Sequence, residues 1–331
     1  MRLAQVRWGN IRRWAPGALI SVVALAAVFR MASWQDFKRV AATIPLLNLL
    51  AVAVLSLVAF GVRALAWQVL LAWRTSFRRS FFLINLGYFL NNVLPLRAGE
   101  IGRAIFMGSA SGLGTFRVLS SIVVERSFDM VMAAGLLLAT LPLVLDIARA
   151  RATAVVTMIL VILGLIALFL IARNAAKVHL WVSGLRFPQV QKWIVPHLDS
   201  LLDGFQPIMQ RGRFLLSATL IALSWLLWVC MYYLILLPIA PQFPFYGAIF
   251  ISAVLALGVA IPAAPGGLGI YEASAVGSLA LFGISPSAAL AVALWLRFLQ
   301  FTITGIFGFY ELVHDRHSIS ALFEKVKTAS V

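Results

Sequence analysis

The stretch IPAAPGGLGIYE, residues 261–272, decides the fold class of this chain. It interrupts a run from Phe214 to Tyr310 in which only Glu272 and Arg297 carry a charge. Such a long apolar run is typical of a protein embedded in a bilayer. Hydrocarbon cannot bond the N–H and C=O groups that a proline and glycine break releases, so such backbone is expected only where protein or water shields it. The break is therefore a candidate working site.

Composition and charge agree with a membrane protein. Of 331 residues, 62% are hydrophobic and 11% charged, whereas soluble domains average about 25% charged residues. The net charge of +16 comes from Lys and Arg clusters between apolar runs, which favours a membrane surface over nucleic acid as partner. The single cysteine, Cys230, lies in an apolar run and the four histidines lack ligand spacing, so we expect no metal and no cofactor.

Hydrophobic runs predict the architecture. Six of them are apolar and long enough, or nearly so, for membrane spans: residues 15–30, 43–72, 118–145, 152–172, 214–238 and 287–311. Residues 80–96 and 245–262 end in proline-containing breaks instead. We predict that each begins a re-entrant helical hairpin, 80–115 and 245–283, which returns to the face it left. The expected fold is an all-α polytopic membrane protein forming one integral membrane domain, residues 1–331.

Positive charge predicts the orientation of the spans. The N-terminus, loop 73–79 and loop 173–213 are rich in Lys and Arg, whereas loop 238–246 has no charge. We therefore predict that both termini are cytoplasmic, although this scheme leaves a smaller basic set outside: Arg30, Lys38, Arg39, Arg149 and Arg151. Within loop 173–213, apolar residues between 198 and 209 recur at helical spacing. They predict an amphipathic stretch on the headgroup layer, or alternatively a partner-docking site.

The predicted hairpins enter from opposite faces, each between two spans. Residues 43–145 and 214–311 therefore resemble an inverted-topology repeat, from which transporters build a midplane site. The spacing of the two breaks also matches, in the order proline, glycine, glycine: Pro95, Gly99 and Gly102 in the first, Pro262, Gly266 and Gly269 in the second.

Two groups of charges lie where the chain is expected at membrane depth. In the first, Arg97, Glu100 and Arg103 are three apart and share one helical face. An arginine at this depth costs about 2.5–3.5 kcal/mol to insert, and its planar fork of donors suits phosphate. In the second, Glu125 and Asp129 share a face and require nearby cations. The alternatives to substrate binding are an interfacial cap with snorkelling arginines and an ion-pair lock between hairpin and span.

The second break offers backbone rather than charge. Its glycines permit close approach to a ligand, and a helix beginning near Gly269 would present N–H groups to an anion. Across the predicted intramembrane set, four arginines balance four carboxylates. Arg63, in the second span, remains as a spare cation unless it snorkels to a membrane face. A small positive excess suits a lipid phosphate.

Three motifs carry a resemblance to a known family. LPLRAGEIGRA (94–104), VVERSFDMV (123–131) and PAAPGGLGIYEAS (262–274) resemble those of the lysylphosphatidylglycerol synthase transmembrane domain family, the flippase part of multiple peptide resistance factors. The resemblance covers residues 10–315. It implies a domain that moves a phospholipid headgroup, such as aminoacylated phosphatidylglycerol, between leaflets of the bacterial cytoplasmic membrane. Two-domain members carry a synthase; this chain ends at Val331, so we expect no aminoacylation. An intramembrane enzyme is a further alternative, but no set of nucleophile, base and orienting residue supports it, so we expect no enzyme activity. Stand-alone relatives associated with hopanoid or glycolipid pathways leave the cargo open.

We therefore predict a lipid translocase with a membrane lipid as substrate. The alternative is a non-transporting subunit that anchors or regulates a lipid-modifying or glycosyl-transferring enzyme. A homo-oligomer or a lipid-synthesising partner fits either prediction. The predicted substrate-binding residues are those of the three motifs with one arginine of the last span: Arg97, Glu100, Arg103, Glu125, Arg126, Asp129, Gly266, Gly267, Gly269, Glu272 and Arg297.

Overall fold

A computed structural model describes most of the predicted helices. The described residues are 22–28, 30–94, 98–144, 210–260 and 264–314, with isolated positions 159, 163, 170, 174 and 177. They contain nine bounded α-helices, one 3-10 turn and no strand. Four helices are long and apolar enough to cross a membrane: α3 (Leu46–Leu70), α6 (Thr115–Val144), α11 (Arg211–Leu236) and α14 (Pro286–His314). The prediction of an all-α membrane protein is confirmed. The predicted span 15–30 is described in its second half, where residues 22–28 are helical. The predicted span 152–172, the stretch 198–209 and the tail beyond 314 lie largely or wholly outside the described residues.

Shorter helices occupy the two predicted hairpin regions. The first holds α4 (Phe77–Val93) and α5 (Gly99–Ser111), and the second holds α12 (Phe245–Ala260), the 3-10 turn η2 (Pro265–Gly267) and α13 (Ile270–Ala280). In each region the helices on either side of the break pack against each other. One further helix, α2 (Trp34–Thr43), was not predicted. Ser33 begins it by accepting a hydrogen bond from the Asp36 amide at 3.4 Å, an ordinary N-cap that a search for apolar spans does not detect.

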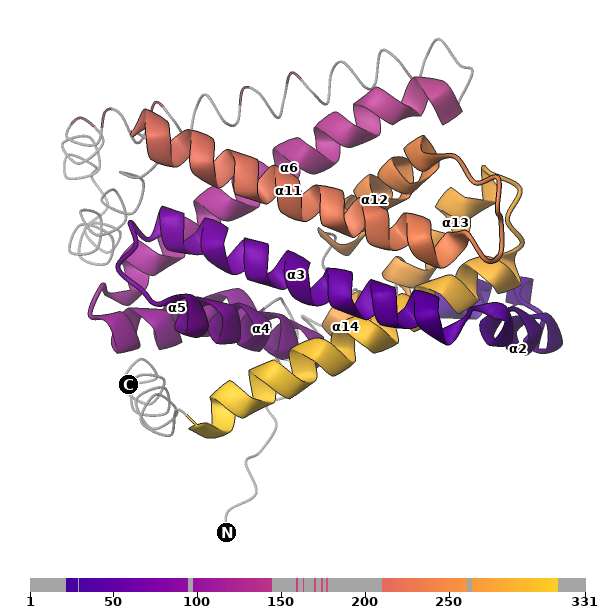
Figure 1. Ribbon diagram of the computed structural model, residues 1–331, viewed down its shortest axis with the longest axis horizontal. Helices are drawn as coiled ribbons and strands as arrows, with labels where there is room; N and C mark the ends of the chain where they lie inside the picture. The colour runs from indigo at the N-terminus through magenta and orange to yellow at the C-terminus, as the bar shows by residue number, and fades with distance from the viewer. Residues whose placement is uncertain are drawn as a thin grey trace.

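The long helices α3 and α11 lie side by side and run in opposite directions through the centre of the molecule (Figure 1). The Asn48 amide of α3 donates to the Leu234 carbonyl of α11 at 3.0 Å, which joins the start of one helix to the end of the other. Around this pair, α4 packs against α14 and α12 packs against α6. Each short helix before a break therefore contacts the long helix that follows the other break.

The α4–α5 pair and the α12–α13 pair extend from their breaks toward opposite ends of the molecule (Figure 1). At one end, Arg79 of α4 donates to the Ala110 carbonyl of α5 at 3.1 Å, and Arg78 donates to the Tyr310 hydroxyl near the end of α14 at 3.4 Å. At the other end, the rings of Phe243 and Phe282 bring the start of α12 to the end of α13, with centroids 5.1 Å apart. We call the first of these the basic end, because it carries six arginines: Arg74, Arg78, Arg79, Arg117, Arg211 and Arg213.

The two breaks differ in local structure although their proline and glycine spacing matches. Gly99 and Gly102 are helical residues of α5, whereas Gly266, Gly267 and Gly269 have positive φ angles of 66°, 64° and 86°. Only the second break uses glycine for a left-handed backbone. The spacing match is therefore not a match in conformation. Pro95 and Pro262 lie outside the described residues.

At the first break, glycine allows contact between α4 and α5. A Cβ atom on Gly99 would lie 2.0 Å from the Gly87 carbonyl oxygen. The Gly99 amide donates to the Asn91 side chain at 2.9 Å, which fixes the start of α5 against the end of α4. A side chain at this position would force the two helices apart.

We expect Gly99→Ala to destabilise the protein strongly, by more than the about 1–3 kcal/mol typical of overpacking, because the added methyl meets backbone. Gly305→Ala is the control, since a Cβ there meets nothing within 4 Å. Thermal unfolding of the detergent-solubilised proteins measures both. Equal melting temperatures for the two variants would contradict the close α4–α5 contact.

Candidate functional site

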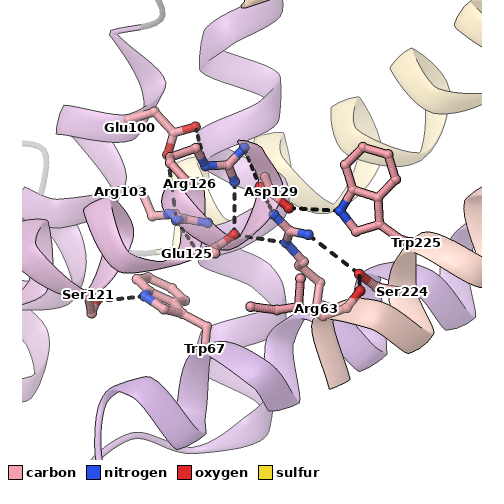
Figure 2. A network of polar contacts seen from close by, with 11 residues as sticks. Arg63, Trp67, Glu100, Arg103, Ser121, Glu125, Arg126, Asp129, Ser224 and Trp225 are labelled. Carbon is pink, nitrogen blue, oxygen red and sulfur yellow. Dashed lines mark hydrogen bonds and ion pairs between the residues drawn. The ribbon is translucent and has the colours of Figure 1, made fainter. Parts of the chain in front are cut away.

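A network of ion pairs joins α3, α5 and α6, with the fully buried Glu125 at its centre (Figure 2). Its carboxylate accepts from Arg63 Nε at 2.9 Å, Arg103 Nη2 at 2.7 Å and Arg126 Nη2 at 2.8 Å. The first two arginines come from α3 and α5, so one carboxylate holds three helices together. This confirms the expectation that Glu125 engages arginine across the hairpin.

Two further carboxylates complete the network. Asp129 accepts from Arg63 and, at 3.1 Å, from the Trp225 indole of α11, and it lies 3.2 Å from Arg126 Nη1. Glu100 lies 3.5 Å from Arg103 and 3.6 Å from Arg126. Three arginines thus meet three carboxylates, and the network is electrically balanced.

Arg63 is neither a spare cation nor a snorkelling one, which corrects the expectation from sequence. Its side chain is only 6% exposed, and Glu125 and Asp129 of α6 both hold it. Arg103 is likewise buried, with its guanidinium 4.4 Å from the Trp67 ring centroid. Trp67 donates in turn to the Ser121 hydroxyl at 3.0 Å. These contacts match the predicted ion-pair lock between hairpin and span.

A second, smaller cluster lies at the other break. Arg297 of α14 lies 2.9 Å from Glu272 and donates to the Gly266 carbonyl at 2.7 Å. Glu272 also accepts from the Gly269 amide at 2.7 Å, which caps the start of α13. The Arg297 guanidinium lies over the Tyr271 ring at 4.7 Å. One arginine therefore fixes both the left-handed backbone of the break and the helix that follows it.

The two clusters have the same plan. Arg126 is the twelfth residue of α6 and Arg297 the twelfth residue of α14. Each pairs with a glutamate in the first turn of the helix that follows the break, Glu100 in α5 and Glu272 in α13. Both arginines therefore connect a long helix to the hairpin that precedes it.

A cavity of about 540 Å³ separates the two clusters. Five of the predicted substrate-binding residues line it: Arg126, Asp129, Gly266, Gly267 and Arg297. Arg63, which was not predicted as a binding residue, lines it as well. The structure places five predicted residues elsewhere, in the ion pairs and cap that support the lining: Glu100, Arg103, Glu125, Gly269 and Glu272. Arg97 lies outside the described residues.

The lining follows the helix register of both halves. Counted from the start of each helix, nine lining positions of α3, α4 and α6 recur as lining positions of α11, α12 and α14. The pairs are Phe60 with Trp225, Arg63 with Trp228, Tyr88 with Ala256, Asn91 with Val259, Asn92 with Ala260, Arg126 with Arg297, Asp129 with Gln300, Met130 with Phe301, and Ala133 with Thr304.

The mouth of the cavity is apolar. Leu94 and Met130, which line it, are 39% and 46% exposed, and Ala256 and Ala260 are exposed as well. Met130 is the sixteenth of the 30 residues of α6, so this mouth lies halfway along a membrane-length helix. A cavity with arginines inside therefore opens sideways, halfway along a helix long enough to cross a membrane.

Sequence reasoning missed the aromatic and amide part of the lining. Tyr88, Trp225 and Trp228 were not distinguishable from ordinary apolar helix residues. Asn91 and Asn92 are uncharged polar residues at the end of an apolar run, just before the first break, and both line the cavity. Uncharged polar residues beside a predicted break were therefore the available signal.

Comparison with known proteins identifies the family. Residues 14–308 match the family model described as the lysylphosphatidylglycerol synthase TM region. The chain belongs to this family. A UPF0104 membrane protein of Methanothermobacter thermautotrophicus is 25% identical over 317 residues, which cover 90% of this chain and 92% of that protein. No solved structure matches the chain. Membership in the lysylphosphatidylglycerol synthase TM region family confirms the resemblance seen in the three motifs.

Proposed function

We propose that this protein is a lipid translocase that moves a phospholipid or related headgroup between leaflets of the cytoplasmic membrane. The observation that carries this proposal is the cavity of about 540 Å³, which has Arg126 and Arg297 on its walls and an apolar mouth at mid-depth. Its volume lies within the about 300–1,000 Å³ typical of small-molecule sites. A headgroup fits inside while its acyl chains extend through the mouth into the bilayer.

The binding mode follows from the donors in the wall. A guanidinium presents a planar fork that matches two phosphate oxygens. Arg126 is the most accessible of the three arginines that line the cavity, with a side chain 28% exposed against 6% for Arg63 and 8% for Arg297. The amides of Asn91, Asn92 and Gln300 line the same space and suit hydroxyl, ester or amine groups beside the phosphate. Aminoacylated phosphatidylglycerol is one lipid of this class.

An inverted repeat gives this cavity a means of alternating access. Under exchange of the two halves, the α4–α14 contact becomes the α12–α6 contact, and the nine lining pairs exchange as well. We propose six spans with α4–α5 and α12–α13 as re-entrant hairpins that enter from opposite faces. Discontinuous helices around a midplane site are the arrangement by which secondary transporters rock between two faces.

We propose that the basic end faces the cytoplasm, following the positive-inside rule. In a Cys230→Ser background, a cysteine replacing the exposed Gln242 is expected to react with a membrane-impermeant maleimide added outside cells. A cysteine replacing the exposed Gln210, which makes no capping bond, is expected to stay unlabelled until the membrane is permeabilised. The reverse pattern would invert the orientation, and external labelling of both would contradict the number of spans.

Transport itself is tested in liposomes. We expect the reconstituted protein to carry a fluorescent phospholipid from the inner leaflet to a quencher outside, several times faster than protein-free liposomes do. The lipids compared are phosphatidylglycerol, its lysyl ester and phosphatidylethanolamine. If no lipid moves faster than in empty liposomes, the translocase proposal is wrong and the non-transporting subunit is favoured.

A further inference from the structure

We propose that α2 is an interfacial helix that binds anionic phospholipid at the end of the molecule opposite the basic end, through Lys38 and Arg39 beside an exposed Trp34. The proposal goes beyond the translocase function and does not depend on it, because α2 contributes no residue to the cavity. α2 lies at the end of the molecule where α3 and α14 begin (Figure 1).

The depth of α2 in a membrane follows from the helix that comes after it. α3 begins at Leu46, three residues after α2 ends, and its first residues Leu46 and Leu47 are 70% and 76% exposed. A helix of 25 residues rises about 37 Å, somewhat more than the about 30 Å of a hydrocarbon core. The start of α3 therefore lies near the boundary between headgroups and acyl chains, and α2 lies at the same level.

One face of α2 is held by the protein. Phe37 packs against the main apolar core. The Trp295 indole of α14 donates to the Ala41 carbonyl at 3.1 Å, and the Ser33 amide donates to the Ser287 hydroxyl at 2.9 Å. The positions on the other face are exposed: Gln35, Lys38, Arg39 and Ala42. A helix with an apolar face and with Lys and Arg on its free face is typical of helices that lie in the plane of the interface.

The charge of this end is concentrated at α2. Within residues 30–94, 98–144, 210–260 and 264–314, every charged residue at this end lies in α2 or just before it: Arg30, Asp36, Lys38 and Arg39. All four are exposed, and in these ranges none of the three basic residues forms an ion pair. Three basic residues and one acidic residue leave an excess of positive charge that no protein carboxylate matches. Anionic headgroups supply the complementary charge at this depth, whereas the positive-inside rule leaves these residues unexplained.

Trp34 is exposed at the start of α2 and places the basic residues among the headgroups. It is 62% exposed, its ring stacks on Phe37 with centroids 5.2 Å apart, and Lys38 Nζ lies 5.1 Å from its centroid. Tryptophan is enriched at headgroup depth because its ring has an apolar body and a polar N–H group. With the ring at this depth, the Lys38 ammonium lies among phosphates. Arg39 adds a planar fork of donors beside it.

The test uses bromine carried on the acyl chains near the headgroup, which quenches tryptophan fluorescence only at short range. The full chain is reconstituted in phosphatidylcholine vesicles that contain either brominated phosphatidylglycerol or brominated phosphatidylcholine. The chain has ten tryptophans, so the Trp34 signal is the difference between each protein and its Trp34→Phe variant. We expect phosphatidylglycerol to associate at Trp34 about fivefold more strongly than phosphatidylcholine, the effect of one basic residue at an anionic surface. Lys38→Gln combined with Arg39→Gln is expected to lower this ratio to about one.

A matched control removes the same charge elsewhere. Arg74→Gln combined with Arg211→Gln changes two exposed arginines at the basic end and is expected to leave the ratio at Trp34 unchanged. Equal quenching of the wild type by both lipids would show that α2 does not select anionic lipid. Absence of quenching would place Trp34 against water or a second copy of the chain, and a ratio that persists without Lys38 and Arg39 would assign the selectivity to other residues. Each of these three results overturns the proposal, and none of them bears on the translocase function, which the transport assay tests separately.

Discussion

Glu125→Gln is expected to destabilise the protein by about 3–5 kcal/mol, the cost of leaving buried charge without its partner. The Glu125 carboxylate is fully buried and contacts three arginines within 2.9 Å. Glutamine keeps the shape but removes the charge, so that three guanidinium groups share two carboxylates. Thermal unfolding of purified protein in detergent or lipid nanodiscs measures the loss.

Two comparisons make this prediction specific to charge. Glu100→Gln makes the same chemical change at a carboxylate that is 19% exposed, with partners at 3.5 and 3.6 Å, and is expected to cost less. Leu136→Ala, which truncates a partly buried residue of α6, is also expected to cost less. Adding Arg103→Gln to Glu125→Gln is expected to recover part of the loss, because it restores the charge balance. A loss for Glu125→Gln no larger than that for Leu136→Ala would mean that water, and not protein, surrounds these charges.

Filling the cavity is expected to have the largest effect on transport. Ala133 is 2% exposed and lines the cavity from the middle of α6. We expect Ala133→Phe to reduce lipid movement to the rate of empty liposomes, because the ring occupies space that the headgroup requires. Since about 540 Å³ is open beside it, the free energy of unfolding is expected to fall by no more than the about 1–3 kcal/mol of moderate overpacking.

Val123→Phe is the matched control, because it introduces the same ring on the same helix at a position that is 42% exposed and outside the cavity lining. It is expected to leave transport and stability near wild type. If Ala133→Phe does not fold, Ala256→Phe obstructs the cavity at its mouth instead. A folded Ala133→Phe protein that transports at the wild-type rate would exclude this cavity as the lipid path.

Sequence alone determined the fold class and the positions of the two breaks. These features depend on local chemistry. A segment such as 214–238 has no stable environment but a bilayer, and IPAAPGGLGIYE has no means of continuing a helix. The motif residues Glu125 and Asp129 were also expected to meet arginine, since buried carboxylates four apart require cations. The sequence had likewise indicated that the glycines of the second break permit close approach to the backbone, and Arg297 does bond the Gly266 carbonyl.

Only the tertiary structure decided which carboxylates each arginine contacts and which arginines line the cavity. Charge counting treated Arg63 as surplus and Arg103 as a lipid ligand, whereas packing buries both in the network around Glu125. The equivalence of Arg126 and Arg297 also became visible only once helix starts fixed their register. The physical reason is that an ion pair depends on distances between helices that are far apart in the chain. Hydropathy and charge spacing report on one helix at a time, and they cannot say which helices share a cavity.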